Sequence, residues 1–201
     1  MTPGYSQFTP PQVSDSTKMD VSPQMGRMAY AGNICYCIPG VLATGSGAVA
    51  LPANTITYEP FFVESEITID KMAFNVTTTP ASNSLVAMGI YLADADWQPT
   101  GAPLVANEIS VLNGFTGIKS QSVSLTLPRG RYLKALNCSV TFTARSVGGY
   151  LPCIGLIPTM PATMVLSGGK VTSAYATLPN TPVAWDTILT NNTYFCFLRI
   201  P

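Results

Sequence analysis

The sequence contains no histidine. Histidine supplies the general base of Ser-His-Asp and Cys-His nucleophilic sites, so its absence excludes these catalytic arrangements. Metal sites with an imidazole ligand are excluded for the same reason. The G-x-S-x-G nucleophile turn and the G-x-x-x-x-G-K-[ST] phosphate loop are also missing. We therefore expect a protein that is not an enzyme and that has no catalytic residue, no metal and no cofactor.

Charge is scarce as well. Charged residues make up 10% of the 201 residues, and the formal net charge is zero. The basic residues are scattered, which excludes the clustered cations that nucleic-acid binding needs. No apolar run is long enough to span a membrane, so we expect no membrane insertion. So few charges protect a lone monomer poorly against association, which favours a subunit of a larger assembly. A Ser/Thr/Asn-rich surface, as in extracellular β proteins, is the alternative explanation.

The start of the chain lacks the basic residues and apolar core of a secretion signal, so we expect synthesis in a cytoplasm. Five cysteines are present, and four of them lie in apolar sequence. In a reducing compartment these residues are expected to be reduced, buried thiols and not a disulfide framework. The five are Cys35, Cys37, Cys138, Cys153 and Cys196.

Residues 1–30 are rich in proline, serine, threonine and glutamine, which predicts an extended arm without its own core. Such an arm is either a disordered tail or a segment that becomes ordered on a partner. Spaced apolar residues favour the second interpretation, a docking arm. These anchors are Tyr5, Phe8, Val13, Val21, Met25, Met28 and Tyr30. Residues 31–54 follow as a Gly/Ala-rich connector with short strands, in which Gly45 and Gly47 are expected to form a turn.

From residue 55 to residue 201 the pattern predicts one all-β domain. Apolar residues make up 47% of the chain, enough for a core, and no segment shows sustained helical periodicity. Residues 84–92 and 194–200 are apolar on both faces, which indicates buried strands. The count of short strands with regularly spaced turns predicts an antiparallel β-sandwich of the jelly-roll kind.

Local patterns give finer expectations. Between Ile69 and Met72 the apolar alternation changes phase, which predicts a bulge near Asp70 and Lys71. Residues 119–127 and 131–143 alternate regularly, so each is expected to be a strand with one solvent-exposed face. Because L-P-R-G lies between them, the two are expected to form a hairpin.

The loop at 94–101, D-A-D-W-Q-P-T-G, is the best candidate for a ligand site. Asp94 and Asp96 flank a residue before Trp97, an aromatic that could stack on a sugar, and Gln98 adds an amide. Paired carboxylates can hydrolyse glycosides without histidine. The alternatives are that the Asp side chains bond their own backbone and that Trp97 packs under the loop. We keep Asp94, Asp96, Trp97 and Gln98 as candidate glycan contacts.

The order and spacing of the strands and loops from about residue 55 to about residue 145 resemble a β-sandwich module of bacteriophage tail-fibre, tail-spike and other virion surface proteins. Residues 1–50 show no such likeness. The matching positions are Tyr58, Pro60, I-T-I-D at 67–70, G-I-Y at 89–91, the loop at 94–101, T-G at 116–117 and L-P-x-G at 127–130.

The resemblance implies a homo-oligomeric, commonly trimeric, structural protein of a phage virion, made in the host bacterial cytoplasm. In one form it is a tail-fibre or head-fibre appendage, docked on other virion proteins by its arm, whose sandwich is exposed to host surface glycans. In another it is a decoration protein that clamps the capsid and binds no ligand. A bacterial carbohydrate-binding module is a third alternative.

Overall fold

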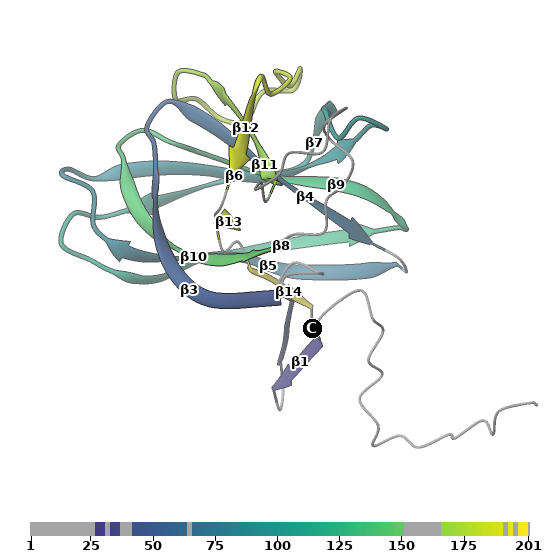
Figure 1. Ribbon diagram of the computed structural model, residues 1–201, viewed down its shortest axis with the longest axis horizontal. Coiled ribbons are helices and arrows are strands. Elements are labelled where there is room, and N and C mark those ends of the chain that lie inside the picture. Colours follow the sequence, from purple (N-terminus) through teal and green to yellow (C-terminus); the bar gives the residue numbers. More distant parts are fainter. Residues whose placement is uncertain are drawn as a thin grey trace, which may run out of the picture.

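The computed structural model describes residues 27–30, 33–36, 42–63, 66–150, 166–190, 193–194 and 197–200. Every regular element in these ranges is a β-strand (Figure 1). The strands are β1 (Arg27–Tyr30), β2 (Asn33–Tyr36), β3 (Leu42–Leu51), β4 (Thr55–Val63), β5 (Ile67–Thr78), β6 (Ser84–Ala93), β7 (Pro99–Val111), β8 (Gly117–Leu127), β9 (Gly130–Cys138), β10 (Phe142–Tyr150), β11 (Leu166–Thr172), β12 (Thr187–Thr190), β13 (Thr193–Tyr194) and β14 (Phe197–Ile200). The described residues include no helix that could cross a membrane.

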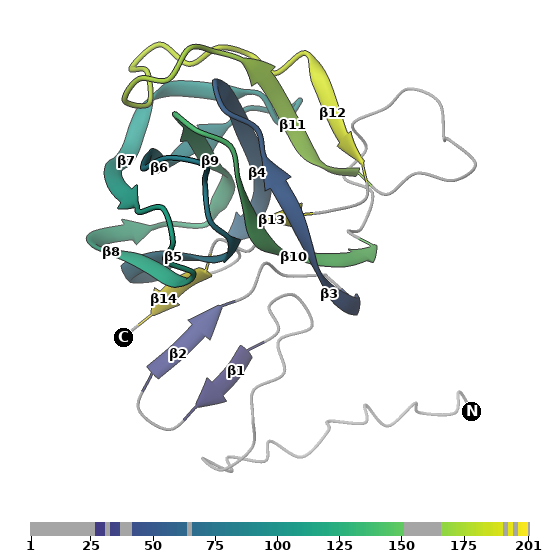
Figure 2. The ribbon, with the colours of Figure 1, turned by 90° about the vertical axis from the view of Figure 1, so that its left-hand side faces the viewer.

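The strands form two sheets that pack face to face (Figures 1 and 2). One sheet has eight strands, in the order β1-β2-β14-β5-β10-β13, with β3 added beside β10 and β8 beside β5. The other has six, in the order β12-β11-β4-β9-β6-β7. All ladder pairs are antiparallel. The expected all-β antiparallel sandwich is therefore confirmed, while residues 1–26 of the expected arm lie outside the described part of the chain.

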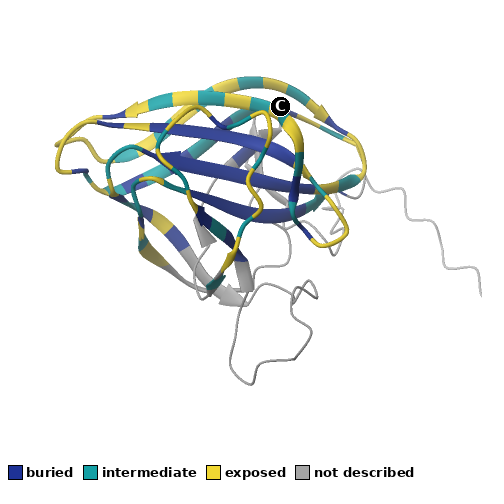
Figure 3. Ribbon diagram, turned by 90° about the horizontal axis from the view of Figure 1, so that it is seen from above, coloured by how far each residue is buried: buried dark blue, intermediate teal, exposed yellow. Residues whose placement is uncertain are grey.

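The main core lies between the sheets, because alternate residues of each strand point inward. Phe61 of β4 stacks on Tyr132 of β9, with ring centroids 5.5 Å apart. Phe74 of β5 and Phe142 of β10 meet at 5.7 Å within the eight-stranded sheet's inner face. Figure 3 shows the resulting pattern, with central strands buried along their length and exposed residues toward the rim.

The central strands of the six-stranded sheet are buried on both faces. Their outer side chains form a second cluster with residues of an irregular segment at 173–186, which we call the covering segment. This agrees with the expectation for residues 84–92. The expectation of an exposed face for 131–143 is wrong over β9, whose residues from Tyr132 to Cys138 are all buried. Sequence periodicity could not show it, because the cover comes from a segment with no strand pattern of its own.

The predicted hairpin between β8 and β9 is also wrong. β8 pairs with β5 in the eight-stranded sheet, whereas β9 pairs with β4 and β6 in the other sheet. The chain thus crosses between the sheets at the L-P-R-G turn, where the hydroxyl of Tyr132 donates a hydrogen bond to the carbonyl of Pro128 at 2.7 Å. Both strands still point their apolar rows into the same core, so alternation alone does not distinguish a hairpin from this crossing.

Two other local expectations have opposite outcomes. The predicted bulge is confirmed by a register shift between Ile69 and Lys71 in the pairing of β5 with β8. The expected turn at Gly45 and Gly47 is wrong, because β3 continues through both residues and pairs with β10. An added Cβ at Gly47 would lie 3.1 Å from Oγ of Ser146, so glycine here permits close packing and does not mark a turn.

At the C-terminal end, β14 lies between β2 and β5, and Leu198 is buried in the main core. A strand in the second half of the segment at 194–200 is therefore confirmed, and its described side chain, Leu198, is buried. Tyr194, in contrast, belongs to a separate short strand, β13, which pairs with β10.

Candidate functional site

The loop between β6 and β7 is organised by Asp94. One carboxylate oxygen, Oδ1, accepts hydrogen bonds from the backbone N–H groups of Asp96 and Gln98, both at 2.8 Å. The N–H of Trp97 donates to the Asp94 carbonyl at 3.3 Å, and Trp97 itself adopts a left-handed φ of 61°. Asp94 therefore shapes the loop through hydrogen bonds to the loop backbone, which is one of the alternatives that the sequence left open for it.

Trp97 lies under this loop. Its side chain is 7% exposed and belongs to the cluster beneath the covering segment. The guanidinium of Arg131 stands over the indole at 5.5 Å from the ring centroid and donates to the carbonyl of Ala95 at 2.9 Å. The sequence left two interpretations of Trp97 open, and the structure shows the one in which the side chain packs under the loop. Trp97 has a positive φ, a local backbone conformation that the residue pattern does not reveal.

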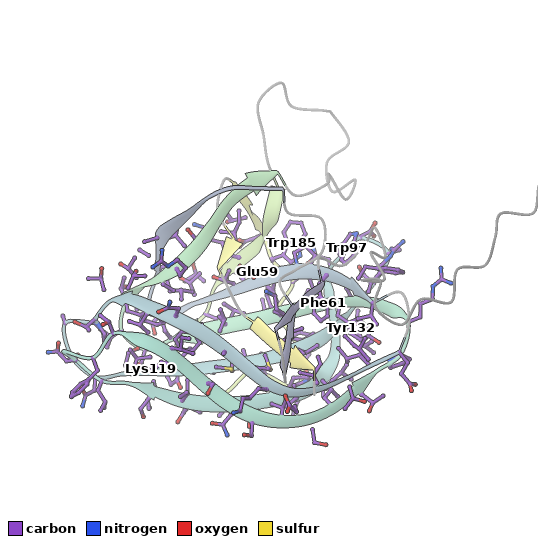
Figure 4. The ribbon with its side chains drawn as sticks, turned by 90° about the horizontal axis from the view of Figure 1, so that it is seen from below. Glu59, Phe61, Trp97, Lys119, Tyr132 and Trp185 are labelled. Atoms are coloured by element: carbon purple, nitrogen blue, oxygen red, sulfur yellow. The ribbon has the colours of Figure 1, made fainter. Side chains whose placement is uncertain are left out.

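Trp185 joins this loop to the covering segment. Its indole Nε1–H donates to the Trp97 carbonyl at 2.9 Å, and its backbone N–H donates to Oε1 of Gln98 at 3.1 Å. One side of the indole lies against Gly169 of β11, where an added Cβ would come within 2.2 Å of the ring. Figure 4 shows the two tryptophans near each other at the same end of the sandwich. Gln98 is thus a structural acceptor here, and Trp185 is partly exposed.

The carboxylates of this region lie at the surface. Asp94, Asp96 and Asp186 are all exposed, and Oδ1 of Asp186 accepts a hydrogen bond from the Thr187 hydroxyl at 2.8 Å. The structure therefore brings together all four residues that the sequence suggested as glycan contacts. It assigns Asp94 and Gln98 to loop structure, buries Trp97 and leaves Asp96 on the surface.

The covering segment is fixed to the sheet at several points. Near its start, Asn54 accepts from the N–H of Ser173 through its carbonyl and from the N–H of Tyr175 through its side chain, both at 2.9 Å. Farther along, the hydroxyl of Tyr91 donates to the Pro179 carbonyl at 2.8 Å. Burial raises the pKa of Tyr91 to about 12, so this hydroxyl keeps its proton at neutral pH.

At the edge of the six-stranded sheet, the hydroxyl of Tyr175 donates to a carboxylate oxygen of Glu108 on β7. Burial is the main cause that raises the pKa of Tyr175, and the hydrogen bond to Glu108 adds to it. This contact gives the covering segment a further attachment to the sheet.

Inside the sandwich, an ion pair joins neighbouring strands. Nζ of Lys134 on β9 lies 2.8 Å from Oε2 of Glu59 on β4, directly across the ladder, and each side chain is 1% exposed. The same inner face carries the buried hydroxyl of Thr57, which has no hydrogen-bond partner. Because both side chains are buried, we assign the pair a structural role.

The described residues contain no group of three or more metal-ligating side chains. Among the cysteines, the described side chain is Cys138, a buried free thiol whose pKa burial raises to about 12. Cys138 is therefore a buried, protonated thiol, as expected for this one residue. The arm residues Tyr5, Phe8, Val13, Val21 and Met25 lie outside the described residues.

No protein-family model matches the sequence, and no curated protein matches it. Sequence reasoning missed Trp185 and Arg131 as members of this site. Trp185 lies after residue 146, where the residue pattern is weak, and Arg131 begins the segment at 131–143, whose alternation carries no sign of a contact with the loop at 94–98. Only the fold brings the two beside the loop of Trp97.

Proposed function

We propose that the protein is a non-enzymatic structural component of a bacteriophage virion, of the surface-appendage kind. Its N-terminal arm docks on other virion proteins, and its sandwich assembles with further copies of itself, as a trimer if the resemblance extends to symmetry. The support is the strand and loop order over residues 55–145 together with a surface that carries few charges. These features belong to a protein that works by contact with other subunits.

The observation that carries the proposal is an apolar patch at one end of the sandwich, which we call the apolar tip. It consists of Leu112, Phe115 and Ile118, which are 44%, 61% and 70% exposed. The adjoining connections at 79–83 and 112–116 contain no charged residue. The N–H of Asn113 donates to Oδ1 of Asn83 at 2.9 Å, which holds the two connections together. A fixed, uncharged patch of large apolar side chains is typical of a protein contact surface.

The tip and the candidate glycan loop are at opposite ends of β7, because residues 94–98 precede that strand and residues 112–116 follow it. A subunit that docks through one end can therefore present the other end outward. This polarity favours an appendage over a decoration protein that lies flat on the capsid lattice.

Purified particles provide the test. We expect the protein to copurify with virions, and electron microscopy of particles with a tagged copy to show density projecting from the tail or from the head. Density spread over the whole capsid lattice would make it a decoration protein. If particles lack the protein altogether, the proposed function is wrong.

A further inference from the structure

We propose that Trp185 is the stacking platform of a saccharide-binding site at the junction of the covering segment and the loop at 94–98. This inference rests on the proposed function, in which this end of the sandwich faces the host. It replaces Trp97, the aromatic that the sequence suggested, with a residue from a distant part of the chain.

The first argument is that the indole of Trp185 is held in one orientation. Its ring N–H and its backbone N–H are both bonded, to the Trp97 carbonyl and to the Gln98 side chain. The ring bond restrains rotation of the indole, and the backbone bond holds the residue beside the loop. A ligand that stacks on a fixed ring loses no side-chain entropy there, which is the advantage of a preorganised site.

The second argument is that strand β11 supports one side of the Trp185 indole. Gly169 has no side chain, so the indole lies directly on the β11 backbone, in space that a Cβ would fill. Because one side of the ring rests on the sheet and the residue is still partly exposed, the exposed part is on the side that faces away from the sheet. The result is a flat apolar surface backed by a rigid strand.

The third argument is the polar border. Asp186 follows Trp185 in the chain, and Asp96 precedes Trp97; both carboxylates are exposed. Carboxylates accept hydrogen bonds from sugar hydroxyls, while the apolar ring face suits the C–H face of a pyranose. The two carboxylates carry more negative charge than the guanidinium of Arg131, which stands over Trp97, can offset. This charge balance disfavours an anionic ligand. The site therefore fits a neutral or amino sugar better than a phosphate or a nucleic acid.

The experiment probes the full-length protein with an array of bacterial surface oligosaccharides: O-antigen, capsular and peptidoglycan fragments. The bound sugar is then titrated against wild type, Trp185→Ala and the matched variant Phe115→Ala, which also removes an exposed aromatic side chain. We expect Trp185→Ala to weaken binding about tenfold or more, since it removes the stacking surface. Phe115→Ala should leave the affinity within about twofold, because this exposed aromatic lies at the opposite end of β7 from the loop at 94–98.

Oxidation by N-bromosuccinimide gives a second readout that does not depend on a variant folding. Mass spectrometry of peptides should show Trp185 oxidised faster than Trp97 in the free protein, and Trp185 protected when the saccharide is bound. Absence of binding to every neutral or amino sugar, or a bound sugar that leaves the oxidation of Trp185 unchanged, would overturn the proposal. Particles that carry the protein without such binding contradict this site alone, whereas particles without the protein contradict the proposed function.

Discussion

At the scale of single residues, side chains that look alike in the sequence have opposite roles in the fold. Trp97 lies in a polar loop and is buried, whereas Trp185 lies in an apolar stretch and is partly exposed. Asp94 and Asp96 are both exposed, yet only Asp94 organises the loop, through bonds to two backbone N–H groups. The direction of each side chain is set by the local backbone, which for Trp97 has a positive φ.

Burial of Trp97 predicts a structural effect for its removal. Trp97→Ala should lower the free energy of unfolding by roughly 3 kcal/mol, the usual magnitude for a large aromatic removed from a core. Denaturant unfolding measures the difference. Asp96→Ala is the control, because that exposed side chain has no bond that the loop needs and should change stability by less than about 0.5 kcal/mol. Equal stability of Trp97→Ala and wild type would contradict the burial described here.

The buried hydroxyl of Tyr91 predicts a loss of stability in alkali. Its pKa in the folded protein is about 12, above the ordinary value of 10.0. The folded state thus holds the proton more tightly, so the contribution is complete below pH 10 and is lost as the pH rises toward 12. Denaturant midpoints between pH 8 and pH 12 should fall less steeply for Tyr91→Phe than for wild type. Parallel curves would show that Tyr91 does not titrate in this way.

At the scale of strands, Glu59 and Lys134 couple the centres of β4 and β9 across one ladder position. Removal of one partner leaves a charge in the core. We therefore expect Lys134→Met to destabilise the protein by about 3–5 kcal/mol. The double variant Glu59→Leu/Lys134→Met should recover most of that loss, because it removes both charges and fills the space. A double variant as unstable as the single one would mean that the pair's other contacts, and not its charges, dominate.

The strands themselves were largely predictable, and their partners were not. Alternation located β8, the two-sided apolar pattern located β6, and a change of phase located the bulge after Ile69. The same alternation predicted a hairpin from β8 to β9, because both arrangements point the apolar row into the core. Cover on the outer face of β9 depends on residues 173–186, more than thirty positions later in the chain. The local residue pattern therefore predicts the strands, whereas the candidate site depends on contacts between residues far apart in the sequence.

At the scale of the whole molecule, the scarcity of charge and the apolar tip both favour association with another subunit. A monomer with formal charge zero and large exposed apolar side chains at one end is prone to associate. The inner core does not need Phe115 or Ile118, since both side chains face solvent. Exposure of these apolar side chains to water is unfavourable for the free protein, and a neighbouring subunit that covers them would remove that exposure.

This reasoning gives a prediction for the double variant Phe115→Asp/Ile118→Asp. Because both side chains are exposed, the melting temperature of the isolated sandwich should change by no more than about 2 °C. Charges at the tip should nevertheless prevent a dry contact, so light scattering should show a smaller particle than wild type at equal concentration, and incorporation into virions should fall. Val183→Asp is the matched control, since Val183 is an exposed apolar residue of the covering segment, away from the tip. If the control reduces assembly as strongly as the double variant, added charge itself is the cause; if neither changes the mass in solution or in particles, the tip is not a contact surface.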